Sequence, residues 1–143
     1  MKKLLPKSVR NPKGFTLVEL LVVVSIIAVL SVIGITVFTG LQKNARDSRR
    51  KADIDSIAKA LEANYTSGSA TPYPVLVATM FSGGLIPDDP QNADTFVYSG
   101  KPGAAAATYT VCAKLENGKG GNSSDTNGAA AADGAFYCRK NQQ

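Results

Sequence analysis

The 143-residue chain contains no histidine and no tryptophan, and it has only two cysteines. Without histidine, the Ser-His-Asp and Cys-His arrangements of nucleophilic catalysis cannot form, and the commonest zinc ligand is missing. The sequence also lacks the glycine-rich loop and lysine of a phosphate-binding P-loop. No pair of acidic residues converges on an evident cleft. We therefore expect the protein not to be an enzyme.

Charge is distributed unevenly along the chain. The formal net charge is +5, and the first 14 residues hold five basic residues and no acidic one. These five are Lys2, Lys3, Lys7, Arg10 and Lys13. After Gly14, basic and acidic residues balance. Because nucleic-acid binding needs basic residues gathered on a folded surface, we expect no specific nucleic-acid partner.

One long segment is almost free of charge. Residues 15–41 contain a single ionisable group, Glu19, and the 22 residues from Leu20 to Leu41 contain none. A helix of that length spans ~33 Å, which matches the ~30 Å hydrocarbon core of a bilayer. In lipid a lone segment must satisfy its own backbone groups, so we expect a helix despite the many valines and isoleucines. A buried core helix is the alternative, but the remaining chain looks too small to cover it.

The segment is also longer than the apolar core of a cleaved secretory signal, which has ~7–15 residues, and no A-x-A pattern follows it. We therefore expect it to remain in the product. The basic leader predicts a cytoplasmic N-terminus, with everything after about residue 42 outside the membrane. The precursor is then a single-pass protein of the cytoplasmic (inner) membrane.

The junction between the basic leader and the apolar run resembles the type IV prepilin motif. Gly14 ends the leader, Phe15 follows it, and Glu19 lies four residues beyond Phe15. The resemblance is sharp over residues 10–40 and loose afterwards. It implies that prepilin peptidase cuts between Gly14 and Phe15 and that Phe15 is then N-methylated. The chain would be a substrate and a structural subunit, with no cofactor of its own.

The same resemblance gives Glu19 a role in subunit assembly. In that family, the acid at this position pairs with the N-terminal amine of a neighbouring subunit, here the amine of Phe15. A lone carboxylate in an apolar core is costly, whereas a carboxylate paired with an ammonium is tolerated. Position alone also allows Glu19 to reach the lipid headgroups instead. Many family members carry a proline in this helix. None occurs here between Gly14 and Pro72, so any unwinding on assembly is expected near Gly34.

We divide the chain into a leader (1–14), an apolar helix (15–41), an amphipathic continuation (42–67) and a C-terminal head (68–143). Apolar residues of the continuation recur at helical spacing on one face, namely Ile54, Ile57, Ala58, Leu61 and Tyr65. A basic cluster comprises Arg46, Arg49, Arg50 and Lys51. It could contact lipid phosphates or a neighbouring subunit, or form a solvated face with pairs such as Asp55–Lys59.

The head is predicted to be α+β, with three to four antiparallel strands packed on the long helix. We expect a short helix over Val75–Ser82 and strands over Thr95–Ser99, Thr108–Leu115 and Ala135–Arg139. Loops 100–107 and 117–134 separate the strands. This layout also agrees with the head that the family resemblance implies.

Cys112 and Cys138 both lie in predicted strands of a head outside the cytoplasm, where disulfides persist. We expect them to be bonded, which would stabilise the head by about 3–4 kcal/mol in the chain-entropy model. Two free thiols are the alternative. Alternation along the strand puts Cys112 opposite the apolar face of Val111 and Ala113, so the bridge is expected on the outer face.

Two acid-bearing loops could hold Ca²⁺. One contains Asp88, Asp89 and Asp94, and the other contains Asp125, Asn127 and Asp133. Ca²⁺ takes six to eight oxygen ligands, and the segment 125–128 is only a fragment of an EF-hand loop. Ordinary Asx turns are therefore the favoured interpretation.

These patterns favour a structural subunit of a type IV pilus or related filament. Its partners would be prepilin peptidase, copies of itself and other pilins, the inner-membrane assembly machinery and, before assembly, the lipid bilayer. After assembly it would lie in a filament at the cell surface. A secretion or DNA-uptake pseudopilin is an alternative within the same class. A single-pass anchored binding domain that never polymerises is the alternative from another class, and in it Gly14 would not be cut.

Overall fold

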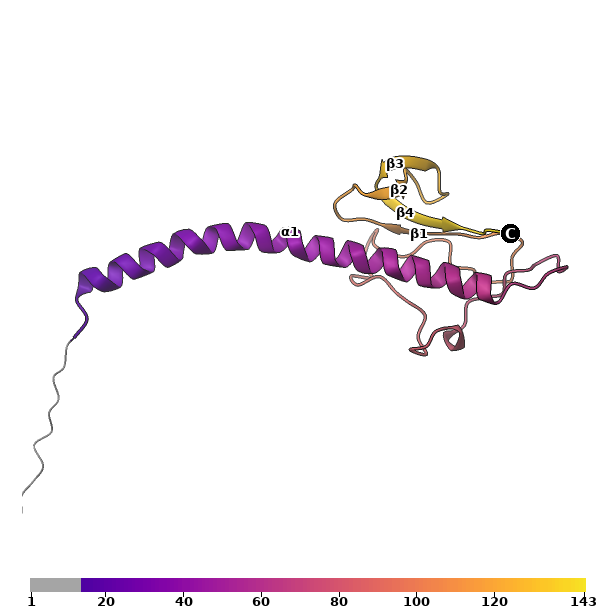
Figure 1. Cartoon of the computed structure of the whole chain (residues 1–143), viewed down its shortest axis with the longest axis horizontal. Coiled ribbons are helices and arrows are strands. Elements are labelled where there is room, and N and C mark those ends of the chain that lie inside the picture. Colours follow the sequence, from indigo (N-terminus) through magenta and orange to yellow (C-terminus); the bar gives the residue numbers. More distant parts are fainter. Residues whose placement is uncertain (1–13) are drawn as a thin grey trace, which may run out of the picture. The chain divides into compact units, whose positions relative to one another are not determined.

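The computed structural model describes residues 14–143, so the basic residues of the leader lie outside the described part. Its elements are α1 (Leu17–Ala63), the 3-10 turn η1 (Ala78–Met80), β1 (Thr110–Lys114), β2 (Gly121–Ser123), β3 (Ala130–Gly134) and β4 (Phe136–Lys140) (Figure 1). The described residues divide into two compact units, residues 14–38 and residues 39–143. The fold class is α+β, as the sequence predicts.

The first unit contains the apolar part of α1, and its side chains are exposed all around the helix. Large apolar side chains from Leu17 to Val37 keep between 48% and 79% of their surface exposed. Ser25 and Ser31 donate their hydroxyls to backbone carbonyls one turn earlier, at 2.8 and 2.7 Å, so neither requires an outside partner. α1 is long and apolar enough, by length and composition, to cross a membrane.

The second unit contains a four-stranded antiparallel sheet with the order β1-β4-β2-β3. In Figure 1 this sheet lies along the C-terminal part of α1. Gly121 and Gly134 sit where β2 approaches its neighbours closely. A Cβ on Gly121 would come within 2.1 Å of the Phe136 carbonyl oxygen, and one on Gly134 within 1.9 Å of the Ser123 carbonyl oxygen. Only glycine fits these two positions.

The hydrophobic core joins one face of α1 to the inner face of β1. Ile54, Ile57 and Leu61 are fully buried, and Val111 and Ala113 pack in the same cluster. The apolar spacing read from the sequence therefore identified the packed face of the helix correctly. Burying side chains of this size stabilises a fold by about 1.5–3 kcal/mol each, before entropy is counted.

Three tyrosines extend this core past the end of the helix. The rings of Tyr65 and Tyr73 lie 5.3 Å apart, and those of Tyr73 and Tyr109 lie 4.9 Å apart, edge to face. Tilted and edge-to-face contacts of this kind are favoured by the ring quadrupoles. They fix the segment after α1 against the strand that leads into the sheet.

Several local predictions for the head were wrong. The expected helix over Val75–Ser82 is only the 3-10 turn η1, which buries no residue and so gains no packing energy to extend it. The expected strand over Thr95–Ser99 is not formed. Asn92 and Asp94 just before it have φ of 45° and 52°, which turns the chain. Within the segment there are two isolated bridges, Phe96 with Ala93 and Ser99 with Cys112.

The predicted loop over residues 117–134 contains two strands, β2 and β3. Its glycines, alanines and asparagines have low strand propensity, which explains the error. Pairing of β2 with both β3 and β4 forms these strands in spite of their composition. The sheet therefore gains half of its strands from a segment without strand-like sequence.

Cys112 and Cys138 are disulfide-bonded and lie directly opposite each other in the β1–β4 register. The sequence thus predicted both the bridge and its position on the outer face. Both residues are nevertheless buried, because a turn after β2 covers them, with the carbonyl of Thr126 3.3 Å from the Cys112 sulfur. Asp125 Oδ1 holds this turn by accepting backbone N–H groups of Asn127 and Ala129.

Candidate functional site

α1 begins with a reciprocal hydrogen-bonded cap between Thr16 and Glu19. The hydroxyl oxygen of Thr16 accepts the N–H of Glu19 at 3.2 Å. In return, Oε2 of Glu19 accepts both the backbone N–H and the hydroxyl of Thr16, each at 2.8 Å. The carbonyl of Thr16 accepts the N–H of Leu20, which is the first bond of the helix. This arrangement is a capping box.

The cap satisfies backbone groups that a bilayer would leave unpaired. The first N–H groups of any helix lack intrahelical partners, and the hydrocarbon core supplies no water to bind them. The box also gives the Glu19 carboxylate two donors from its own chain. Thr16 is absent from the site residues predicted above, although the Thr-x-x-Glu spacing is the sequence signature of such a cap.

The predicted cleavage site lies directly before this cap. Gly14, Phe15 and Thr16 are not helical, and the Phe15 side chain is 87% exposed. A Cβ placed on Gly14 would meet no atom within 4 Å among the described residues. The bond between Gly14 and Phe15 is thus sterically open within the described chain.

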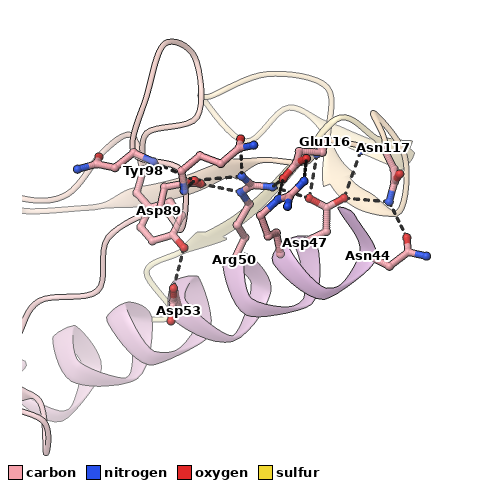
Figure 2. A network of polar contacts seen from close by, with 11 residues as sticks. Asn44, Asp47, Arg50, Asp53, Asp89, Tyr98, Glu116 and Asn117 are labelled. Carbon is pink, nitrogen blue, oxygen red and sulfur yellow. Dashed lines mark hydrogen bonds and ion pairs between the residues drawn. The ribbon is translucent and has the colours of Figure 1, made fainter. Parts of the chain in front are cut away.

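A second group of polar residues lies in the head, around the fully buried side chain of Arg50 (Figure 2). Its Nε and Nη2 bind the two carboxylate oxygens of Asp89 at 2.6 and 3.0 Å. Its Nη1 binds Asp47 at 2.8 Å and Glu116 at 2.7 Å. The guanidinium also lies 4.7 Å from the ring centre of Phe96, within cation–π range. One arginine of α1 therefore holds two separate loops.

Arg46 and Asp47 complete what we call the Arg50 network. Arg46 binds both oxygens of Glu116 at 2.6 Å, the two-pronged geometry that suits a guanidinium. Asp47 accepts the backbone N–H groups of Glu116 at 2.9 Å and Asn117 at 3.2 Å, as Figure 2 shows. The turn after β1 is thereby attached to α1 through both side chains and backbone.

The predicted basic cluster therefore serves the fold of the chain itself. Contact of Arg50 with lipid, with a neighbouring subunit or with solvent is excluded by its burial. Lys51 donates to the carbonyl of Gly120 at 2.6 Å. Of the four cluster residues, Arg49 has the weakest attachment: its side chain is 67% exposed and 3.8 Å from Asp53.

The pair Asp55–Lys59, suggested above for a solvated helix face, is not among the close ion pairs of residues 14–143, although Lys59 helps to lower the pKa of Asp55. Asp55 instead accepts a hydrogen bond from Arg139 of β4 at 2.7 Å and one from the Tyr137 hydroxyl at 3.0 Å. Both partners lie more than 80 positions away in the sequence. The close partners of Asp55 are therefore tertiary contacts with β4.

The model of the prokaryotic N-terminal methylation motif matches residues 9–35. The chain carries the signature of type IV pilins and pseudopilins. The match spans the end of the leader, the cap and most of the apolar part of α1. No curated protein and no solved structure matches the chain. The pilin signature therefore covers the N-terminal segment and does not extend into the head. The properties of the head follow from its structure alone.

Electrostatics in the Arg50 network favour charged carboxylates. Hydrogen bonds from Arg46, assisted by Arg50, lower the pKa of Glu116 from 4.5 to about 2 against the opposing effect of burial. Burial raises the pKa of Asp89, but the hydrogen bonds from Arg50 outweigh it, and the net pKa is lowered. Both groups therefore remain ionised at neutral pH.

Four acidic side chains of the two acid-bearing loops bind other groups of the chain itself. Asp88 pairs with Lys101, and Asp89 binds Arg50. Asp133 accepts the N–H of Gly120, and Asp125 closes the turn over the disulfide. Within residues 14–143, no three side chains of the His, Cys, Asp and Glu types are grouped to hold a metal ion. These loops thus add no support for Ca²⁺.

Replacing Arg50 with methionine is expected to destabilise the head by about 3–5 kcal/mol, because the change leaves buried carboxylates without their partner. The exposed Arg49 provides the matched control, and Arg49→Met should cost no more than about 0.5 kcal/mol. Thermal unfolding of the full chain in detergent measures both values. Equal stability of the two variants would show that the Arg50 network does not organise the head.

The lowered pKa of Glu116 predicts a pH dependence of stability. Its contribution is complete above pH 4.5, the ordinary value, and is lost as the pH falls toward about 2. Glu116→Gln should be less stable than the original chain at pH 7, and the difference should shrink between pH 4.5 and 2. Unfolding midpoints measured across this range test it, and parallel curves for the two proteins would contradict it.

Proposed function

We propose that this chain is a structural subunit of a type IV pilus or a related filament. In this proposal, prepilin peptidase cuts the inner-membrane precursor between Gly14 and Phe15, and the product polymerises through the apolar part of α1. The observation that carries the proposal is the combination of the pilin signature with an apolar helix whose side chains stay about half or more exposed. Such a surface requires cover, first from lipid and then from other subunits.

Removal of the leader would change the chemistry of the N-terminus. It would take away five positive charges and create an α-ammonium on Phe15. An α-amino group has a pKa of ~7.7–8, so most of it is charged at neutral pH, and N-methylation retains the charge. The new cation would be the natural partner for Glu19, the only acid in the apolar segment.

Pairing between subunits is compatible with the cap at the start of α1. Both hydrogen bonds from Thr16 go to Oε2 of Glu19, and among the described residues Oε1 accepts none. An ammonium from a neighbouring subunit could therefore approach Oε1 while the cap stays formed. Only one axial stagger of two helices brings these groups together, so the pair would select the register of the filament.

The remaining parts of the chain fit a structural role. The buried ion pairs and the disulfide hold the head together, and these polar groups are occupied with each other. Surface pili and secretion or DNA-uptake filaments share the processing and assembly steps proposed here. The partners in those steps would be the peptidase, other subunits and the assembly machinery of the inner membrane.

Loss of the Glu19 carboxylate should weaken assembly far more than processing. Glu19→Ala is expected to insert and to be cleaved, but to yield at least about 100-fold less filament, because a buried ammonium would lose its partner at every contact. Sheared surface material, compared with the membrane fraction by immunoblot, measures the yield. Ser25→Ala is the control, because the Ser25 hydroxyl bonds only its own helix, and it should assemble normally. Abundant normal filaments from Glu19→Ala would defeat the proposal.

A further inference from the structure

We propose that Thr16 is a positioning residue for removal of the leader. Its capping box with Glu19 starts α1 at Leu17 and so keeps the Gly14–Phe15 bond outside the helix, where a peptidase can bind it. This inference rests on the proposed function, since it concerns the same cleavage. It assigns Glu19 a task in the precursor that is distinct from pairing in the filament.

The hydrogen bonds of Thr16 set the helix boundary. If α1 began one turn earlier, the N–H of Thr16 would bond the carbonyl of residue 12, as in any helix interior. In the structure, that N–H instead binds Oε2 of Glu19 at 2.8 Å. The hydroxyl of Thr16 simultaneously accepts the N–H of Glu19 and donates to its carboxylate. The cap therefore competes directly with extension of the helix toward the leader.

The position of this boundary matters for cleavage. A helix bonds the carbonyls of its first turn to N–H groups one turn later and holds the chain in a compact conformation, whereas exposed loop segments are the preferred sites of proteolysis. Helix ends fray, and a cap favours one boundary over its neighbours. Extension of the helix by two residues beyond Leu17 would draw Phe15 into the first turn of α1. Gly14 opposes this by its low helix propensity, and the cap adds to that effect.

The two tasks of Glu19 use different properties of its side chain. The cap needs an acceptor at this position, which glutamine also supplies. Pairing with an ammonium needs the negative charge, which glutamine lacks. Thr16→Val removes the hydroxyl but keeps the branched shape, and Thr16→Ser keeps the hydroxyl. These variants separate capping from charge without altering the cleavage site itself.

Loss of the cap should reduce the fraction of precursor that presents an extended site, and this reduction appears as weaker apparent binding. We expect Thr16→Val to raise KM for cleavage about five-fold with kcat unchanged, which is the factor that a lost N-cap typically represents. Thr16→Ser and Glu19→Gln should stay within about two-fold of the original chain. The full-length precursor in lipid vesicles, treated with purified prepilin peptidase and followed by mass spectrometry, provides these values.

Each outcome of this experiment has one meaning. Unchanged KM for Thr16→Val overturns the inference, as does a loss confined to kcat, which would show that Thr16 contacts the enzyme during the reaction. Slow cleavage of Glu19→Gln together with normal cleavage of Thr16→Val would show that charge, and not capping, positions the site, and would overturn the inference. Failure of the original chain to be cut after Gly14 would refute the proposed function itself. Unchanged unfolding of the head in all variants excludes a general folding defect.

Discussion

The apolar part of α1, with its single carboxylate, limits where this protein can be stable. Residues 20–41 carry no charge, and the large apolar side chains of this part of α1 remain exposed in the isolated chain. Water cannot cover this surface cheaply, so lipid or other copies must do so. The Glu19 carboxylate must then have hydrogen-bond or ion-pair partners both in a bilayer and among packed helices. Thr16 supplies two hydrogen bonds to this carboxylate within the chain. An ammonium from a neighbouring copy would neutralise its negative charge in a filament.

In the head, contacts with α1 and a disulfide hold long loops in place on a small domain. One face of α1 provides its hydrophobic core, and Arg50 on another part of the same helix binds two loops through Asp89 and Glu116. The disulfide joins β1 to β4 on the far face of the sheet. Breaking a buried ion pair is costly, so these attachments act as fixed points for segments with little regular structure.

Local sequence patterns predicted the features that depend on neighbouring residues. Periodic spacing identified Ile54, Ile57 and Leu61 as core, and strand alternation placed Cys112 on the outer face. The role of Arg50 could not be found this way, because its partners Asp89 and Glu116 lie 39 and 66 positions away. Likewise, β2 and β3 form because β2 pairs with β3 and β4, and not because their residues have high strand propensity. The cap at Thr16, by contrast, depends on neighbouring residues, and its Thr-x-x-Glu signature is present in the sequence.

The most direct measurement is mass spectrometry of the N-terminus in filaments sheared from the cell surface. We expect a chain that begins at Phe15, carries one added methyl group on its amine and retains the Cys112–Cys138 bridge. Single membrane-bound molecules that still begin with Met1, with no such material in any filament, would contradict it.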